Sequence, residues 1–186
     1  MSRRVIFPDP NIWTEPKEAR MTTYADQPGP ADDRRAAALI LHRRSADEQG
    51  VVAILAEAGE TKRQVQLLLA VMDLYRNAIA ELRSDAGIEL MASYVGDMAQ
   101  RADEAEGPAA DMVKAAPLLD AHAREDWDAF NDVLARAASA GRSANLLIGL
   151  LDLYEVLMPD LNSTTGRDWF TRLIAAFVNE EVQGDG

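Results

Sequence analysis

Residues 64–82 read QVQLLLAVMDLYRNAIAEL, and residues 143–161, 79 positions further along the chain, read SANLLIGLLDLYEVLMPDL. In both stretches an Asp-Leu-Tyr triplet begins six positions after the first residue of a Leu-Leu pair. Apolar side chains occur on nearly every side of a helix drawn through either stretch, a pattern typical of a helix enclosed by other elements. We therefore predict two central helices, each surrounded by its neighbours.

The similarity extends well beyond these two stretches. Without gaps, residues 47–87 and 126–166 share 13 identities in 41 positions, where composition alone would give about three. This excess indicates an internal duplication with a period of about 79 residues. Its shared polar positions are the pairs Asp47 and Asp126, Arg63 and Arg142, and Tyr75 and Tyr154.

Each predicted repeat reads as four helices. In the first repeat, residues 31–106, we expect helices over 31–44, 47–58, 61–83 and 84–102. In the second repeat, residues 107–186, we expect helices over 108–123, 126–138, 141–158 and 165–182. Thr61 is predicted to open the third helix in a capping box with Gln64. The predicted fold class is all-α: a tandem duplication of a four-helix unit, with eight helices in a pseudo-symmetric helical domain or a short α-solenoid.

Residues 1–30 have a different composition, with five of the eight prolines and equal numbers of acidic and basic groups. Such a segment cannot propagate a helix, so we expect an extended or disordered tail. The alternative is a short linear motif at Ile12 and Trp13 that docks on a partner or on the helical domain.

The chain carries 31 acidic and 19 basic residues, a net charge of -12. Residues 31–106 contribute -5, from 14 acidic and 9 basic residues, and residues 107–186 contribute -7, from 13 and 6. This excess argues against binding to nucleic acid or an anionic membrane surface, and favours a basic protein partner. We see no export signal and no bilayer-spanning run, so we expect a cytoplasmic protein. Self-association of the chain is left open.

The motifs of common catalytic and metal sites are absent from the sequence. There is no cysteine, and the two histidines, His42 and His122, lack the spacing of a metal site. Glycines are not arranged as a phosphate loop or a nucleophile elbow. We therefore expect no catalytic residue, no cofactor and no metal, and a protein that is not an enzyme.

One narrow stripe on each central helix is polar or small. On the simplest interpretation it is a solvated edge where a small residue allows close packing. The alternative is a polar-floored groove between the two central helices that receives a partner. In that case the candidate binding residues are Gln66, Asp73, Asn77, Asn145 and Asp152, together with Trp127, which would anchor an interface if exposed or plug the core if buried.

The duplicated polar residues have a structural interpretation. If the second and third helices of each repeat are antiparallel, the hydroxyl of Tyr75 reaches the start of the second helix at Asp47 or a nearby backbone group. Tyr154 would do the same at Asp126. The alternative, a Tyr/Asp acid-base pair, requires a pocket and a second reacting group.

The same antiparallel geometry places Arg63 and Arg142 beside the last turn of the second helix of each repeat. We expect their side chains to hydrogen-bond its free carbonyl groups.

These observations favour a non-enzymatic, cytoplasmic interaction or regulatory protein that presents a helical groove and an acidic face to a protein partner. The alternative is a binder of an apolar small molecule, or an enzyme, with a cavity between the two central helices near Tyr75 and Tyr154. A cavity at these tyrosines would favour the second function, and a solid core the first.

Overall fold

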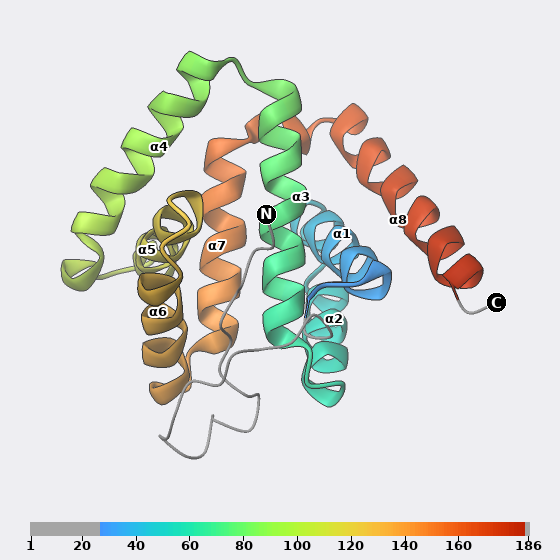
Figure 1. Ribbon diagram of the computed structural model, residues 1–186, viewed down its shortest axis with the longest axis horizontal. Coiled ribbons are helices and arrows are strands. Elements are labelled where there is room, and N and C mark those ends of the chain that lie inside the picture. The colour runs from blue at the N-terminus through green and yellow to red at the C-terminus, as the bar shows by residue number, and fades with distance from the viewer. Residues whose placement is uncertain (1–26, 185–186) are drawn as a thin grey trace. The chain divides into compact units, whose positions relative to one another are not determined.

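The computed structural model describes residues 27–184, which form eight α-helices and no strand (Figure 1). The all-α prediction is therefore confirmed for this range. The tail motif at Ile12 and Trp13 lies outside the described residues. Two short 3-10 helices, Ala102–Glu104 and Pro159–Asn162, precede α5 and α8. The α-helices are α1 (Pro30–Arg44), α2 (Glu48–Glu60), α3 (Gln64–Leu82), α4 (Asp85–Gln100), α5 (Ala110–Ala123), α6 (Trp127–Ser139), α7 (Ser143–Leu157) and α8 (Thr164–Gly184).

Short polar side chains begin several of these helices. The carboxylate of Asp47 accepts the N–H of Gly50 at 3.0 Å at the start of α2. Asp126 accepts the N–H of Ala129 at 3.1 Å at the start of α6, and Ser84 caps α4 in the same way. Each of these side chains satisfies one of the free N–H groups in the first turn of its helix, which is why the predicted starts of these helices agree with the structure.

The capping box predicted at Thr61 is wrong. Thr61 ends α2 instead, and its hydroxyl donates to the carbonyl of Glu57 at 2.8 Å. The next residue, Lys62, has a φ of 56°, a left-handed conformation that terminates a helix. Because this turn separates Thr61 from the first residue of α3, Gln64, the Thr61 side chain belongs to the preceding helix.

Backbone features recur at the offset of 79 residues found in the sequence. Ala46 and Glu125, which are 79 positions apart, have φ values of 54° and 55°. Lys62 and Gly141, also 79 apart, have φ values of 56° and 65°. Both ends of α2 and α6 differ by the same 79 positions. The duplication itself stays a prediction, and these shared turns are what it would produce.

The described helices form two compact units. The terminal unit contains residues 27–82 and 154–184, and in it α1 packs on α8, α3 and α2. The central unit contains residues 83–153, and in it α5 packs on α4 and α6. These units differ from the predicted repeats, 31–106 and 107–186. The reason is that the first helix of each repeat is covered by the fourth helix of the other.

The central helices are deeply buried, as their composition predicts. Every residue of α3 from Gln66 to Met72 is buried. In α7, five leucines of the middle turns are at most 8% exposed: Leu146, Leu147, Leu150, Leu151 and Leu153. Burying a leucine side chain stabilises the fold by about 1.5–3 kcal/mol, so these helices provide much of the apolar stabilisation of their units.

Within the central unit, α7 lies close against α5 at Gly149. A β carbon built on Gly149 would lie 2.2 Å from the carbonyl oxygen of Asp111 and 3.0 Å from the backbone nitrogen of Met112. Both neighbours are backbone atoms that cannot rotate away. Gly149 is the small residue of the polar-or-small stripe on α7, and its lack of a side chain allows this close helix packing.

We expect Gly149→Ala to lower the free energy of unfolding of the central unit by about 1–3 kcal/mol, because the added methyl group would push α5 away from α7. Urea unfolding followed by circular dichroism measures the change. A matched control is Gly96→Ala, where the nearest neighbour of the new β carbon is a side-chain oxygen of Asp120 at 4.0 Å. That variant should gain up to about 1 kcal/mol from helix propensity. Equal stability of the two variants would contradict the close approach.

Candidate functional site

Tyr75 and Tyr154 lie together in the core of the terminal unit. Their rings are stacked, with centroids 3.9 Å apart and an interplanar angle of 7°, and each residue is 1% exposed. Phe170 of α8 packs edge-on against Tyr75, with a centroid distance of 6.5 Å. The rings fill the space between these side chains, so no small molecule fits between the two tyrosines.

The hydroxyl of Tyr75 interacts with Arg44, the buried last residue of α1. The Nε of Arg44 donates to the Tyr75 hydroxyl oxygen at 3.0 Å. The same guanidinium donates to the carbonyls of Met158 at 3.1 Å and Tyr154 at 3.3 Å, and to the side chain of Asn162 at 2.6 Å. Four neutral acceptors thus satisfy one buried cation, and they link the end of α1 to α3 and to the chain that follows α7.

Asp47, the predicted partner of the Tyr75 hydroxyl, binds other groups, so that prediction is wrong. Its carboxylate accepts from Gly50 and lies 2.8 Å from the Nδ1 of His42. Arg44 takes the hydroxyl instead, because a buried guanidinium needs several acceptors and its long side chain reaches them. The corresponding position in the second repeat is an alanine, so comparison of the repeats could not reveal this role. The expected contact of Tyr154 with Asp126 stays a prediction.

The tyrosine hydroxyls are poor candidates for acid-base chemistry. Burial raises the pKa of Tyr75 to about 12, although the neighbouring Arg44 opposes this shift. Burial also raises the pKa of Tyr154, and proximity to Tyr75 adds to the effect. A general base works best with a pKa near the operating pH, so these groups favour the structural interpretation of the pair.

Arg63 and Arg142 bind carboxylates on the first helix of their own repeat. The Nε of Arg63 lies 2.9 and 3.1 Å from the two carboxylate oxygens of Asp32, and Arg142 pairs with Asp111. These side chains were predicted to cap the second helix. Instead the backbone N–H groups of the two arginines donate to carbonyls of α2 and α6, at 2.9 and 2.7 Å. Asp32 and Asp111 are themselves 79 positions apart, so extending the repeat comparison upstream would have found them.

The two Asp-Arg pairs differ in burial. The side chain of Asp32 is 2% exposed and also lies 3.4 Å from Arg35. The side chains of Asp111 and Arg142 are 33% and 52% exposed. The pair in the terminal unit therefore compensates a buried charge, whereas the pair in the central unit is close to solvent.

The residues of the proposed groove have varied surroundings. On α3, Gln66 is buried, Asp73 is ion-paired on its own helix and Asn77 is exposed. On α7, Asn145 donates to Asp111 at 3.1 Å and Asp152 is half-buried. The α3 residues belong to the terminal unit and the α7 residues to the central unit. A groove between the two helices stays a prediction.

Trp127, the first residue of α6, is half-buried. Its ring packs edge-on against His122, with centroids 5.7 Å apart, and against Phe130 at the same centroid distance. Contacts on two sides hold the indole against its own unit, which favours the core-plug interpretation over that of an interface anchor.

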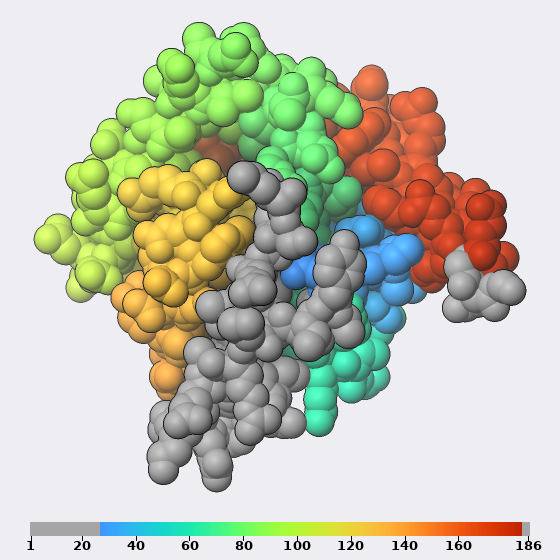
Figure 2. Space-filling model, in the orientation of Figure 1, coloured from blue at the N-terminus to red at the C-terminus, as the bar shows by residue number. Residues whose placement is uncertain are grey.

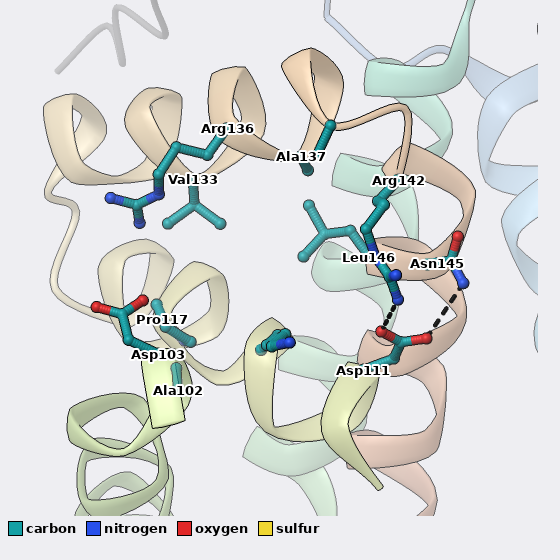
Figure 3. A pocket seen from close by; sticks show the side chains of 12 residues that line it. Ala102, Asp103, Asp111, Pro117, Val133, Arg136, Ala137, Arg142, Asn145 and Leu146 are labelled. Atoms are coloured by element: carbon teal, nitrogen blue, oxygen red, sulfur yellow. Dashed lines mark hydrogen bonds and ion pairs between the residues drawn. The ribbon is translucent and has the colours of Figure 1, made fainter. Parts of the chain in front are cut away.

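A hollow that sequence reasoning did not find lies in the central unit (Figure 3). Its volume is about 220 Å³. We call it the α5–α6 hollow, because half of its lining residues lie on these two helices, with further residues from the preceding 3-10 helix, the turn after α6 and the start of α7. Its apolar lining consists of Ala102, Pro117, Val133, Ala137, Ala140 and Leu146.

Five charged side chains also line the α5–α6 hollow: Asp103, Asp111, Lys114, Arg136 and Arg142. Asp111 is occupied by Arg142 and Asn145, as the dashed lines in Figure 3 show. By contrast, the side chains of Lys114 and Arg136 have no hydrogen-bond or ion-pair partner in the part of the chain that the structure describes. Figure 3 shows Val133 and Leu146 between Arg136 and Arg142, so the cations border an apolar surface.

A second candidate surface is the outer face of α4. Leu90 is 72% exposed and Tyr94 is 43% exposed, and their spacing of four residues places them on one side of the helix. Val95 and Met98 are buried, on the part of α4 that precedes the 3-10 helix. In the space-filling view much of the yellow-green surface of α4 is uncovered (Figure 2).

Comparison with protein families, curated proteins and solved structures gave no match to this chain. No helix between residues 27 and 184 combines the length and the apolar character needed to cross a membrane. Within the same residues, no group of three or more His, Asp or Glu side chains is placed to hold a metal ion. Function is therefore inferred from the two candidate surfaces themselves.

We expect Arg63→Met to lower the free energy of unfolding by about 3 kcal/mol, because it leaves the buried carboxylate of Asp32 without its main partner. The equivalent change in the exposed pair, Arg142→Met, should cost less than about 1 kcal/mol. Urea unfolding of both variants measures the difference. Equal losses would show that burial does not distinguish the two pairs.

The carboxyl group of Asp33 on α1 should make the free energy of unfolding depend on pH. Burial raises its pKa from 3.8 to about 6, and the nearby carboxylates of Asp32, Asp73 and Glu180 add to this shift. The folded state binds the proton of the Asp33 carboxyl group more tightly than the unfolded chain does. The protonated carboxyl group therefore contributes fully to the free energy of unfolding below pH 3.8, and this contribution is lost as the pH rises through 6. Asp33→Asn should therefore be more stable than the parent protein at pH 7.

This advantage of Asp33→Asn should shrink as the pH falls from 7 to 4, because the parent protein becomes protonated at the same position. Thermal unfolding of both proteins across this range measures the difference. A difference that stays constant with pH would contradict the raised pKa.

Proposed function

We propose that this chain is a non-enzymatic, cytoplasmic interaction or regulatory protein, and that α4 presents an acidic, partly apolar face to a basic protein partner. The single observation behind this proposal is the composition of α4. Its outer side exposes Leu90 and Tyr94, and the helix carries three carboxylates but no lysine or arginine between Asp85 and Gln100.

The two exposed apolar side chains would supply the contact energy. Burying a leucine or an aromatic side chain in an interface contributes about 1.5–3 kcal/mol. Tyrosine is also enriched among the residues that dominate interface energetics. Leu90 and Tyr94 are one helical turn apart, so both can insert into one groove or pack on one helix of a partner.

The carboxylates define the chemistry of that partner. Asp85, Glu89 and Asp97 lie on the same helix as the apolar pair, in a chain with a net charge of -12. A segment that carries lysine or arginine beside apolar side chains complements this helix, and its approach is accelerated by electrostatic attraction. A second copy of this chain fits less well, because two such helices would repel each other.

The packed tyrosine pair supports a binding function over the apolar-cavity alternative. The stacked rings of Tyr75 and Tyr154 occupy the space that an apolar ligand would need, and their raised pKa values disfavour acid-base catalysis. The acidic surface of the helices remains as the feature that a macromolecular partner would meet.

Nuclear magnetic resonance titration of the full chain with a basic amphipathic helical peptide of leucine and lysine tests the proposal. We expect the largest amide shifts on α4, and we expect the affinity to fall as salt screens the charges. The double variant Leu90→Ser, Tyr94→Ser should bind at least about tenfold more weakly, a loss of about 1.4 kcal/mol.

A matched control removes an exposed apolar side chain from another helix. Val52 of α2 is 65% exposed, so Val52→Ser should leave the affinity for the peptide unchanged. Shifts spread evenly over all acidic helices, or equal losses in the control and the α4 variant, would contradict α4 as the docking site.

A further inference from the structure

A charge cluster that is balanced in the terminal unit is unbalanced at the equivalent place in the central unit. In the terminal unit, Asp32 pairs with Arg63, and Glu57 of α2 pairs with Arg35 of α1 at 2.7 Å. This cluster contains two carboxylates and two guanidinium groups, so each cation has an anion beside it.

The four positions that lie 79 residues further along are Asp111, Lys114, Arg136 and Arg142, and all four line the α5–α6 hollow. Asp111 and Arg142 reproduce the first pair. The second pair is not reproduced, because Lys114 replaces Arg35 while a cation, Arg136, replaces Glu57. The carboxylate that would hold these two side chains is therefore missing from the central unit.

Two exposed cations without an ion pair line one hollow in a chain where 31 acidic residues face 19 basic ones. Asp103 is the remaining charged residue of the lining. Together the lining carries three cations and two carboxylates, and one of those carboxylates is already bound by Arg142 and Asn145. The remaining balance of about one positive charge suits a ligand with a single negative charge.

From this arrangement we propose that the α5–α6 hollow binds a small organic carboxylate, whose charged group takes the place that Glu57 occupies in the terminal unit. The guanidinium of Arg136 can bind a carboxylate through two parallel hydrogen bonds, and the ammonium of Lys114 supplies a second donor. The apolar side chains of Val133 and Leu146 then contact the carbon skeleton of the ligand.

The hollow is small and partly open to solvent. A volume of about 220 Å³ is below the range of about 300–1,000 Å³ typical of pockets for drug-sized molecules. It suits an acid with a short aliphatic chain or one aromatic ring. The same chemistry occurs at the C-terminal residue of a peptide, so a free acid and a peptide C-terminus are the two possible sources.

Titration of the full chain with benzoate at low ionic strength, followed by amide shifts in nuclear magnetic resonance spectra, tests this proposal. We expect saturable shifts at residues that line the hollow, and no such shifts with benzyl alcohol, which has the ring without the charge. An N-acetylated dipeptide with a free carboxylate, compared with its C-terminal amide, distinguishes the two sources. Tighter binding of the free dipeptide than of benzoate would assign the site to a peptide C-terminus.

Arg136→Glu is the decisive variant, because it restores the charge pattern of the terminal unit. Its new carboxylate should pair with Lys114, so benzoate affinity should fall at least about tenfold while the protein stays folded. Lys114→Gln, which removes a positive charge without adding a negative one, should also weaken binding.

Arg172→Glu on the exposed side of α8 makes the same charge change outside the hollow and should bind benzoate like the parent protein. Undiminished binding by Arg136→Glu, or no saturable shifts in the parent protein, would overturn the proposal.

Discussion

An aspartate at the start of the first helix, bound by the arginine that precedes the third helix, is the interaction that organises the terminal unit, and a more exposed copy of it recurs in the central unit. In the terminal unit Arg63 holds the buried carboxylate of Asp32, and in the central unit Arg142 holds Asp111. The same arginines donate their backbone N–H groups to the end of the second helix. One residue therefore fixes the relative positions of three helices, and the apolar third helix is enclosed as a consequence.

The two units use this shared scaffold in different ways. The terminal unit is neutral at its charge cluster and has a polar network around Arg44, whose acceptors include Tyr75 and Asn162. The central unit has no equivalent of Arg44, and its cluster retains two cations beside an apolar hollow. If the chain arose by duplication and the hollow binds the proposed carboxylate, one copy has kept a fully paired charge cluster and the other has exchanged one carboxylate for a binding site.

The net charge of the chain hides this local difference. A charge of -12 describes the average surface and favours basic partners. In the proposed function the carboxylates of α4 attract such a partner, and the exposed Leu90 and Tyr94 contact it. Yet in the same unit Lys114 and Arg136 both line the α5–α6 hollow. Electrostatic interactions weaken over about 8–10 Å at physiological salt, so a small cationic site can exist on a strongly acidic protein.

The sequence by itself determined the features that depend on neighbouring residues: the all-α class, the starts of α2, α4 and α6 at Asp47, Ser84 and Asp126, and the burial of α3. Caps and apolar periodicity act within one or two turns, so they can be read without coordinates. Only the tertiary structure decided that Arg44 rather than Asp47 binds Tyr75, that each first helix is covered by the fourth helix of the other predicted repeat, and that Arg136 faces a hollow. These outcomes depend on which side chains meet across distant parts of the chain, and spacing along the sequence does not specify such meetings.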